Sequence, residues 1–173
     1  HSPSTTVFTA VFYASFHDFY PTTTAGWFYE FKSLKSIEGL EHLNTSQVTD
    51  MGCMFYGCAS LTSLDLSHFD TSQVGGMSEM FSGCSSLTTI YCNSSWRCGY
   101  SDRMFYGCDF LRCAVAYNKW ETKGNMANPE TGYFTKKVLE EEAEAYVVHS
   151  LDMKRLTFYY DTFRAKRSGT TWG

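Results

Sequence analysis

The chain lacks a long hydrophobic run, a large net charge and a basic cluster. No apolar stretch of its 173 residues approaches the roughly 20 residues that cross a bilayer as a helix. A net charge of -4 at pH 7 offers no basic surface to nucleic acid or to an anionic membrane. We therefore expect no nucleic-acid partner and no membrane insertion in this segment.

The short motifs of common catalytic and cofactor sites are also missing. The sequence contains no HExxH, no P-loop, no GxSxG and no glycine fingerprint for dinucleotides. Its five histidines are scattered. His149, Ser150 and Asp152 have the residue types of a catalytic triad, but they lie too close in sequence to converge easily on one site. We therefore expect a protein that is not an enzyme and that holds neither a cofactor nor a metal.

A start signal is missing as well. The chain begins at His1 without an initiator methionine or a signal peptide, as expected of a processed form or of a segment of a longer protein. The sequence alone therefore says little about where the protein is located.

What the chain does have is a repeat. An apolar pattern that runs from Val48 to Leu66 returns from Val74 to Cys92, offset by 26 residues. A third copy includes Met104, and weaker copies precede around Trp27 and Val11. The members of the best copy are Val48, Met51, Met54, Phe55, Cys58, Leu61, Leu64 and Leu66. A fixed period in this range predicts repeats that bury their apolar sides against one another.

Each repeat has two halves with different periods. Leu64 and Leu66 alternate with polar residues, which predicts a short strand with both leucines inward. A spacing of three to four residues from Val48 to Leu61 predicts a helical or 3₁₀ turn. A strand with leucines followed by a helical turn is typical of leucine-rich repeats. The sequence therefore predicts an α/β-type solenoid with a short parallel strand and a helical turn in each of about five coils.

The residue pattern of the repeat is distinctive. The stretch LDLSHFDTSQVGGMSEMFSGCSSL, from Leu64 to Leu87, resembles the BspA-like leucine-rich repeat family of bacterial surface proteins. Only Gly75 and Gly76 depart from the typical unit of that family. The resemblance covers residues 27–113 strongly and implies a surface-exposed protein without enzymatic activity, associated with adhesion to host proteins or other cells.

From that resemblance we expect a cell-surface or secreted adhesion module. It would present its strand face to an extracellular protein or glycan of unknown identity, as a monomer. The alternative is a structural spacer that displays other parts of a larger surface protein and has no ligand of its own.

The repeat pattern also divides the chain. We expect an incomplete N-terminal coil at residues 1–26, the repeat array at 27–116, an irregular connector at 117–135 and a C-terminal segment at 136–173. The last segment reads as a helix and a β-hairpin that cover the open end of the array.

The strand face is the candidate ligand surface, because repeat proteins often bind through the sheet that their strands build. Glu38 and Asp65 would be neighbours that bind a cation or a basic side chain, or else two solvated carboxylates. Phe12 and Tyr91 would be apolar anchors, or would be covered by flanking segments. One outward column holds Phe12, Glu38, Asp65 and Tyr91, and Ser63 and Thr89 run beside it.

The seven cysteines follow the repeat and none stands in a CxxC motif. Cys58, Cys84 and Cys108 share one column and are expected to be small buried side chains, next to the structural column of Phe55, Phe81 and Phe105. Cys92 and Cys98 both fall at inward positions across a short turn, so they form either a disulfide or two free buried thiols. Cys53 and Cys113 fall on the outside and are candidates for reactivity.

Overall fold

The computed structural model describes residues 6–138, and all structural statements below concern that range. The chain divides into two units, His1–Lys137 and Val138–Gly173, and nearly all described residues belong to the first. The helix and hairpin predicted for residues 136–173 fall almost entirely outside the described residues.

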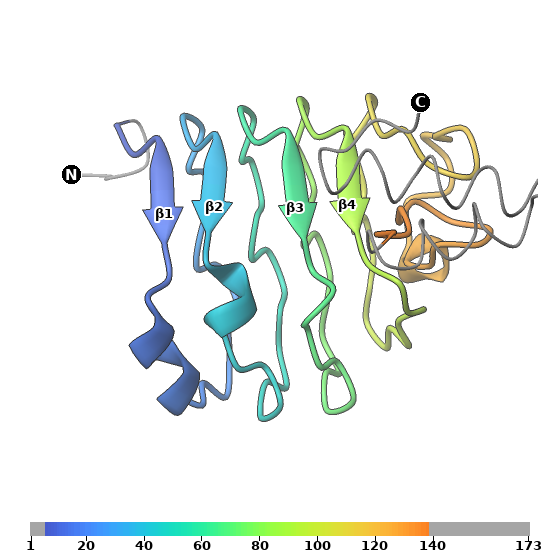
Figure 1. Ribbon diagram of the computed structural model, residues 1–173. Coiled ribbons are helices and arrows are strands. Elements are labelled where there is room, and N and C mark those ends of the chain that lie inside the picture. The colour runs from blue at the N-terminus through green and yellow to red at the C-terminus, as the bar shows by residue number, and fades with distance from the viewer. Residues whose placement is uncertain (1–5, 139–173) are drawn as a thin grey trace, which may run out of the picture. The chain divides into compact units, whose positions relative to one another are not determined.

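Four strands of three residues each run in parallel (Figure 1). They are β1 (Thr9–Val11), β2 (Ser36–Glu38), β3 (Ser63–Asp65) and β4 (Thr89–Tyr91). Strand β1 pairs with β2, and β3 pairs with β4, which gives two separate two-stranded sheets. Three short 3₁₀ helices complete the regular structure: η2 (Ala14–Asp18), η3 (Leu40–His42) and η4 (Gly124–Met126).

The predicted α/β-type solenoid of leucine-rich repeats is wrong. Residues 6–138 contain no α-helix, and their strands do not form one continuous sheet across about five coils. The segment predicted to be a helical turn is a series of tight turns instead. In it, the amide groups of Met54, Tyr56 and Cys58 donate to carbonyl groups three residues earlier.

The other amide groups of this segment explain why it is not a helix. Cys53 and Phe55 donate their N–H groups to the carbonyls of Ser78 and Met80, 2.9 Å away in both cases, in the next repeat. An α-helix would use those donors within its own chain segment. Because a neighbouring repeat satisfies every second amide, the spacing of three to four residues indicates turns with an inward side, not helical structure.

Two columns of left-handed backbone shape these turns. Gly57, Gly83 and Gly107 have φ values of 68°, 75° and 75°, a region that glycine occupies without steric cost. Glu30, with φ 56°, occupies the same column in the first repeat. The second column contains Gly26, Cys53, Glu79 and Arg103, with φ values of 67°, 54°, 56° and 54°. The recurring glycine of the sequence therefore adopts the left-handed backbone of the turn without the steric cost that Glu30 bears there.

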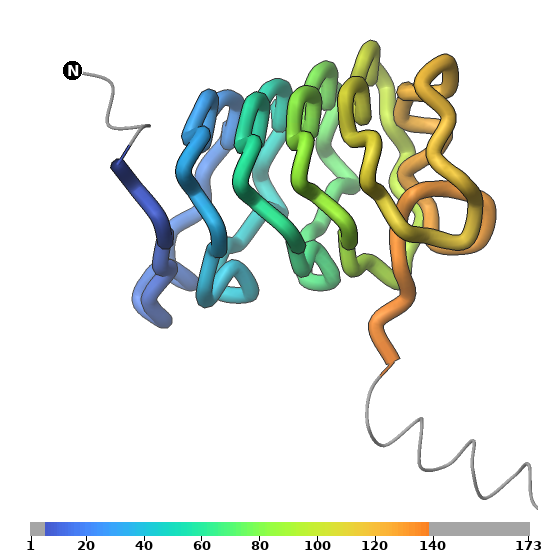
Figure 2. Tube along the Cα trace, turned by 90° about the horizontal axis from the view of Figure 1, so that it is seen from above, coloured from blue at the N-terminus to red at the C-terminus, as the bar shows by residue number. Residues whose placement is uncertain are grey.

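The core consists of aromatic rings in register between repeats, and Figure 2 shows the repeats following one another side by side. The rings of Phe55 and Phe81 stack with centroids 5.8 Å apart, and those of Phe81 and Phe105 lie 5.4 Å apart. All three side chains are fully buried. Leu64 and Leu66 are buried as predicted, at 3% and 0% exposure.

Both ends of this core are closed by segments outside the clear repeats. At the start, Phe12 packs against Phe16 and Phe28, with ring centroids 5.0 and 6.3 Å away. At the other end, Tyr133 and Phe134 pack edge-on against Phe105, at 5.3 and 6.3 Å. Residues of the predicted N-terminal coil and of the predicted connector therefore share one core with the array.

Candidate binding face

The outward side of the four strands carries most of the residues predicted to bind a ligand. Ser63 lies opposite Thr89, and Asp65 lies opposite Tyr91, in the β3–β4 pair. Leu64, between the two outward residues of β3, points into the core. We call the outward residues of β1 to β4, together with the exposed Phe8 that directly precedes β1, the strand face.

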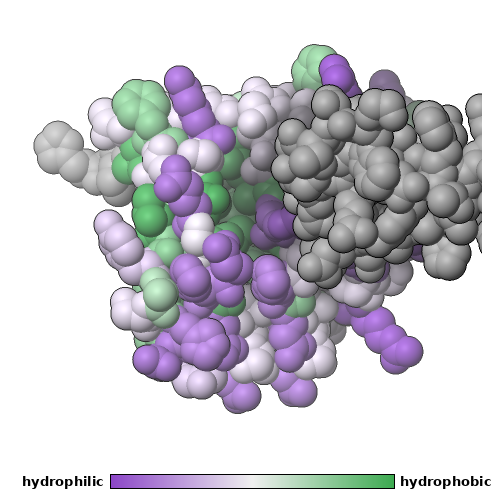
Figure 3. Space-filling model, viewed as in Figure 1, coloured by the Kyte–Doolittle hydropathy of each residue, from purple (hydrophilic) through white to green (hydrophobic). Residues whose placement is uncertain are grey.

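The prediction for Phe12 is wrong by one residue. In the β1–β2 pair Val11, not Phe12, lies opposite Glu38, and Phe12 is only 8% exposed. Side chains alternate along a strand, so a shift of one residue moves a side chain to the other face. Phe8 and Val11 are exposed at and just before β1, at 57% and 48%. Figure 3 looks onto the strands and shows hydrophobic surface over the part nearer the N-terminus.

Glu38 and Asp65 are not register partners, because β2 and β3 do not pair. Asp65 instead forms an ion pair with the Nζ atom of Lys137. Partial burial acts to raise the pKa of Asp65, but hydrogen bonds from Lys137 and Ser67 outweigh it and lower that pKa below its usual value. The same bond raises the pKa of Lys137. Residues 6–138 hold no group of three His, Cys, Asp or Glu side chains placed to bind a metal ion.

Lys137 ends a segment that lies beside β4 although it is outside the clear repeats. Thr135 forms a parallel bridge with Tyr91, and the amide of Cys92 donates to the carbonyl of Thr135 at 3.1 Å. The side chain of Asn93 then exchanges two hydrogen bonds with the backbone of Lys137. The repeat pattern ends near Leu111, so no periodic signal marked these residues as neighbours of β4.

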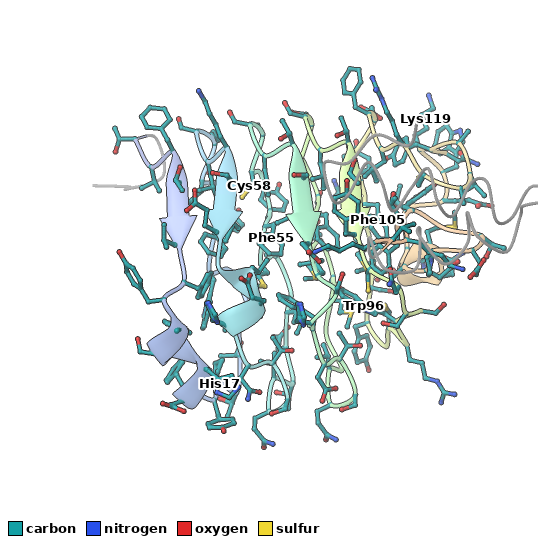
Figure 4. The ribbon with its side chains drawn as sticks, viewed as in Figure 1. His17, Phe55, Cys58, Trp96, Phe105 and Lys119 are labelled. Carbon is teal, nitrogen blue, oxygen red and sulfur yellow. The ribbon has the colours of Figure 1, made fainter. Side chains whose placement is uncertain are left out.

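The column of Cys58, Cys84 and Cys108, the cysteine column, is fully buried. Each thiol donates a hydrogen bond to a backbone carbonyl of the preceding repeat. The acceptors are the carbonyls of Phe28, Phe55 and Phe81, at 3.2, 3.1 and 3.1 Å respectively. Figure 4 labels Cys58 and the neighbouring Phe55 in the interior behind the strands. Burial raises the pKa of Cys58 and of Cys108 to about 12. Thiols in this state are poor nucleophiles.

The other four cysteines are also free thiols in the structure. Cys92 contacts the carbonyl oxygen of Ser94 at 3.5 Å, whereas Cys98 lies 3.3 Å from the sulfur of Met77. Cys53 and Cys113 are half-buried rather than fully exposed. Burial and the carboxylate of Glu79, 3.9 Å away, raise the pKa of Cys53.

The described residues thus define a repeat protein with parallel strands on one side and tight turns on the other. No helix among residues 6–138 is long and apolar enough to pass through a membrane. The family model described as "Mycoplasma protein of unknown function, DUF285" matches residues 22–146, and the chain belongs to this family. No curated protein and no solved structure matches the chain.

This membership corrects the resemblance drawn from the sequence. The matching model is not that of the BspA-like proteins, and no leucine-rich repeat family matched. The repeated apolar positions produced the resemblance. These positions show which side chains face the interior. A series of tight turns places inward side chains at the same intervals as a leucine-rich repeat does.

Proposed function

We propose that this chain is a non-catalytic binding module, acting at a cell surface or in the medium around cells, and that it holds an extracellular protein on its strand face. The proposal rests chiefly on Val11 in β1 and Phe8 directly before it, two apolar side chains that are about half exposed. Apolar anchors within a polar rim are the usual centre of a protein interface.

Charged side chains surround these anchors. The Nζ atom of Lys35 lies 5.5 Å from the centre of the Phe8 ring, and Glu38 lies opposite Val11. A partner that covers this end of the face would therefore need apolar groups at its centre and charges of both signs at its edge. That requirement favours a folded protein surface over a lipid layer or a nucleic acid.

The test is binding of the intact chain to immobilised extracellular-matrix proteins, measured by surface plasmon resonance. The double variant Phe8→Ser, Val11→Ser is expected to weaken binding at least tenfold, since removal of a central anchor costs about 2 kcal/mol or more. Phe110→Ser is the matched control, because Phe110 is also exposed, at 64%, but lies in a turn.

Two results would contradict the proposal. Unchanged binding by the double variant would remove the strand face as the site. If the unaltered chain bound none of the proteins up to high micromolar concentration, a spacer without a ligand would be the better account. Surface biotinylation of intact cells, with antibody detection of this chain, tests the location separately.

A further inference from the structure

A hollow of about 460 Å³ lies at the turns that follow β3 and β4, outside the strand face. Small-molecule sites in proteins typically enclose about 300–1,000 Å³. Phe69, Val74 and Trp96 form its apolar lining. We call it the Phe69–Trp96 hollow; Figure 4 labels Trp96 below the strands.

A shortened turn creates this hollow. The rings of Phe69 and Trp96 stack in parallel with centroids 6.3 Å apart. Asp65 and Tyr91 are equivalent positions of two neighbouring repeats, because they pair in the β3–β4 register, and Gly76 and Tyr100 are equivalent because they form a parallel bridge. Eleven positions separate Asp65 from Gly76, but only nine separate Tyr91 from Tyr100. The later turn therefore lacks two residues and leaves one side of the earlier turn uncovered.

Asp70 is held rigidly at the rim. Its amide donates to the hydroxyl oxygen of Thr45 at 2.7 Å, and the same hydroxyl donates to its carbonyl at 3.0 Å. Its carboxylate accepts the amide of Ser72 at 2.9 Å, and the hydrogen bonds from Ser72 lower the pKa of Asp70. Asp70 is thus a fixed carboxylate at neutral pH, and it forms no ion pair within residues 6–138.

The aromatic part of the hollow is equally constrained. Trp96 is 6% exposed and packs edge-on against Phe134, with ring centroids 4.9 Å apart. Its amide donates to the carbonyl of Ala127 at 2.9 Å. The buried indole N–H of Trp96 has no hydrogen-bond acceptor among the described residues.

We propose that the Phe69–Trp96 hollow binds one sugar unit of a glycan. Asp70 accepts hydroxyl hydrogens while Arg97, on the same rim, donates to hydroxyl oxygens, and a polyhydroxylated ring serves both at once. The apolar C–H groups of the ring meet the small exposed parts of Phe69 and Trp96, which are 7% and 6% exposed and line the hollow. Hydroxyl groups of Thr71, Ser72, Ser94 and Ser95 complete the lining.

The two charges of the rim argue against simpler ligands. A phosphate or another anion would be repelled by Asp70, and a metal ion or an ammonium group would be repelled by Arg97. A neutral ligand with many hydroxyl groups is repelled by neither charge. This site is independent of the protein partner proposed above, because none of its residues belongs to the strand face.

The test is an NMR titration of the intact, ¹⁵N-labelled chain with free glucose, galactose, mannose and N-acetylglucosamine, into the tens of millimolar. At least one sugar is expected to shift the amide signals of Ser72, Ser94 and Arg97 and the indole N–H signal of Trp96, with a Kd on the order of 1 mM. The indole signal is assigned with Trp96→Phe.

Charge-removing variants then identify the contacts. Asp70→Asn and Arg97→Gln are each expected to weaken binding about tenfold, the usual effect of losing a charged hydrogen bond. Asp70→Asn keeps the turn, because Asn44 makes the equivalent bond to the amide of Ser46 at 3.0 Å in the preceding repeat. Asp109→Asn and Lys119→Gln are the matched controls and are expected to bind as the unaltered chain does.

The proposal is overturned if no sugar shifts these signals, if the shifts fall elsewhere, or if Asp70→Asn and Arg97→Gln bind like the controls. Binding of short peptides from a random library in the hollow, with no response to any sugar, would also overturn it. Loss of protein binding by the Phe8 and Val11 variant leaves this test unaffected, so the two proposals fail independently.

Discussion

Asn93 and Lys137 exchange two hydrogen bonds although 44 positions separate them in the sequence. The amide of Lys137 donates to Oδ1 of Asn93 at 2.7 Å, and Nδ2 of Asn93 donates to the carbonyl of Lys137 at 3.1 Å. The side chain of Asn93 thereby pairs with the N–H and the carbonyl of Lys137, as the backbone of a neighbouring strand would. This contact fixes the last described residues against β4.

Replacing Asn93 by alanine removes both bonds at once. We expect Asn93→Ala to lower the free energy of unfolding by about 1–3 kcal/mol, at about 0.5–1.5 kcal/mol for each bond. Urea unfolding followed by circular dichroism measures this loss. Asn125→Ala is the control, since the exposed side chain of Asn125 makes no hydrogen bond with described residues. Equal stability of the two variants would mean that the contact contributes nothing.

The ion pair between Asp65 and Lys137 should depend on pH in a defined direction. The folded-state pKa of Asp65 is lowered, so its contribution is full above the unfolded pKa of about 3.9 and is lost as pH falls through the folded pKa. Water reaches both side chains of the pair, which are 46% and 35% exposed, so Asp65→Asn should cost at most about 1 kcal/mol at pH 7.

The measurement is the difference in unfolding free energy between the unaltered chain and Asp65→Asn. It should shrink between about pH 5 and pH 2. The pKa of Lys137 is raised, so the difference should shrink again only when pH rises above about 10.5. Glu38→Gln serves as control, because Glu38 forms no ion pair among the described residues. A difference that stays constant over both ranges would contradict the assignment.

Replacement by alanine should have opposite effects on stability at Gly83, which has a left-handed backbone, and at Gly75, which does not. Gly83→Ala should lower stability by about 1–2 kcal/mol, because φ is 75° there. Gly75→Ala should be neutral or stabilise by up to about 1 kcal/mol, since the nearest atom to its added Cβ is the carbonyl oxygen of Thr49, 3.9 Å away. Thermal unfolding of the pair tests the prediction. Glu30→Gly, in the same column as Gly83, should raise the melting temperature.

Cys53 should be the thiol whose reactivity responds to a neighbouring charge. Burial and the carboxylate of Glu79 raise its pKa, so Glu79→Gln should increase the thiolate fraction and speed alkylation several-fold at pH 8. Peptide mapping by mass spectrometry after timed iodoacetamide treatment gives the rate. Glu38→Gln should leave the rate unchanged. The cysteine column should react only after unfolding, and rapid labelling of Cys84 in the native protein would show that the core opens.

The sequence was informative where local spacing decides the outcome. The burial of Phe55, Phe81 and Phe105 follows from apolar residues that recur at a fixed offset. The same spacing misled about the turns, because a helix and a series of tight turns bury side chains at similar intervals.

The candidate site was less predictable. The strand face was identified, but Phe12 was assigned to it in place of Val11, since a strand of three residues gives too little pattern to fix its register. The Phe69–Trp96 hollow had one signal in the sequence, the drop in offset from 26 to 24 residues after Cys92. That drop showed where a turn was shorter but not what the missing residues left exposed.

The sequence by itself determined the period of the repeat and the columns of buried side chains. Each of these depends on residues a few positions apart or on one constant offset. The tertiary structure decided the pairing of β1 with β2 and of β3 with β4, the attachment of Lys137 to Asp65 and Asn93, and the opening at Phe69 and Trp96. These depend on hydrogen bonds and packing between segments far apart in the chain, which no local pattern specifies.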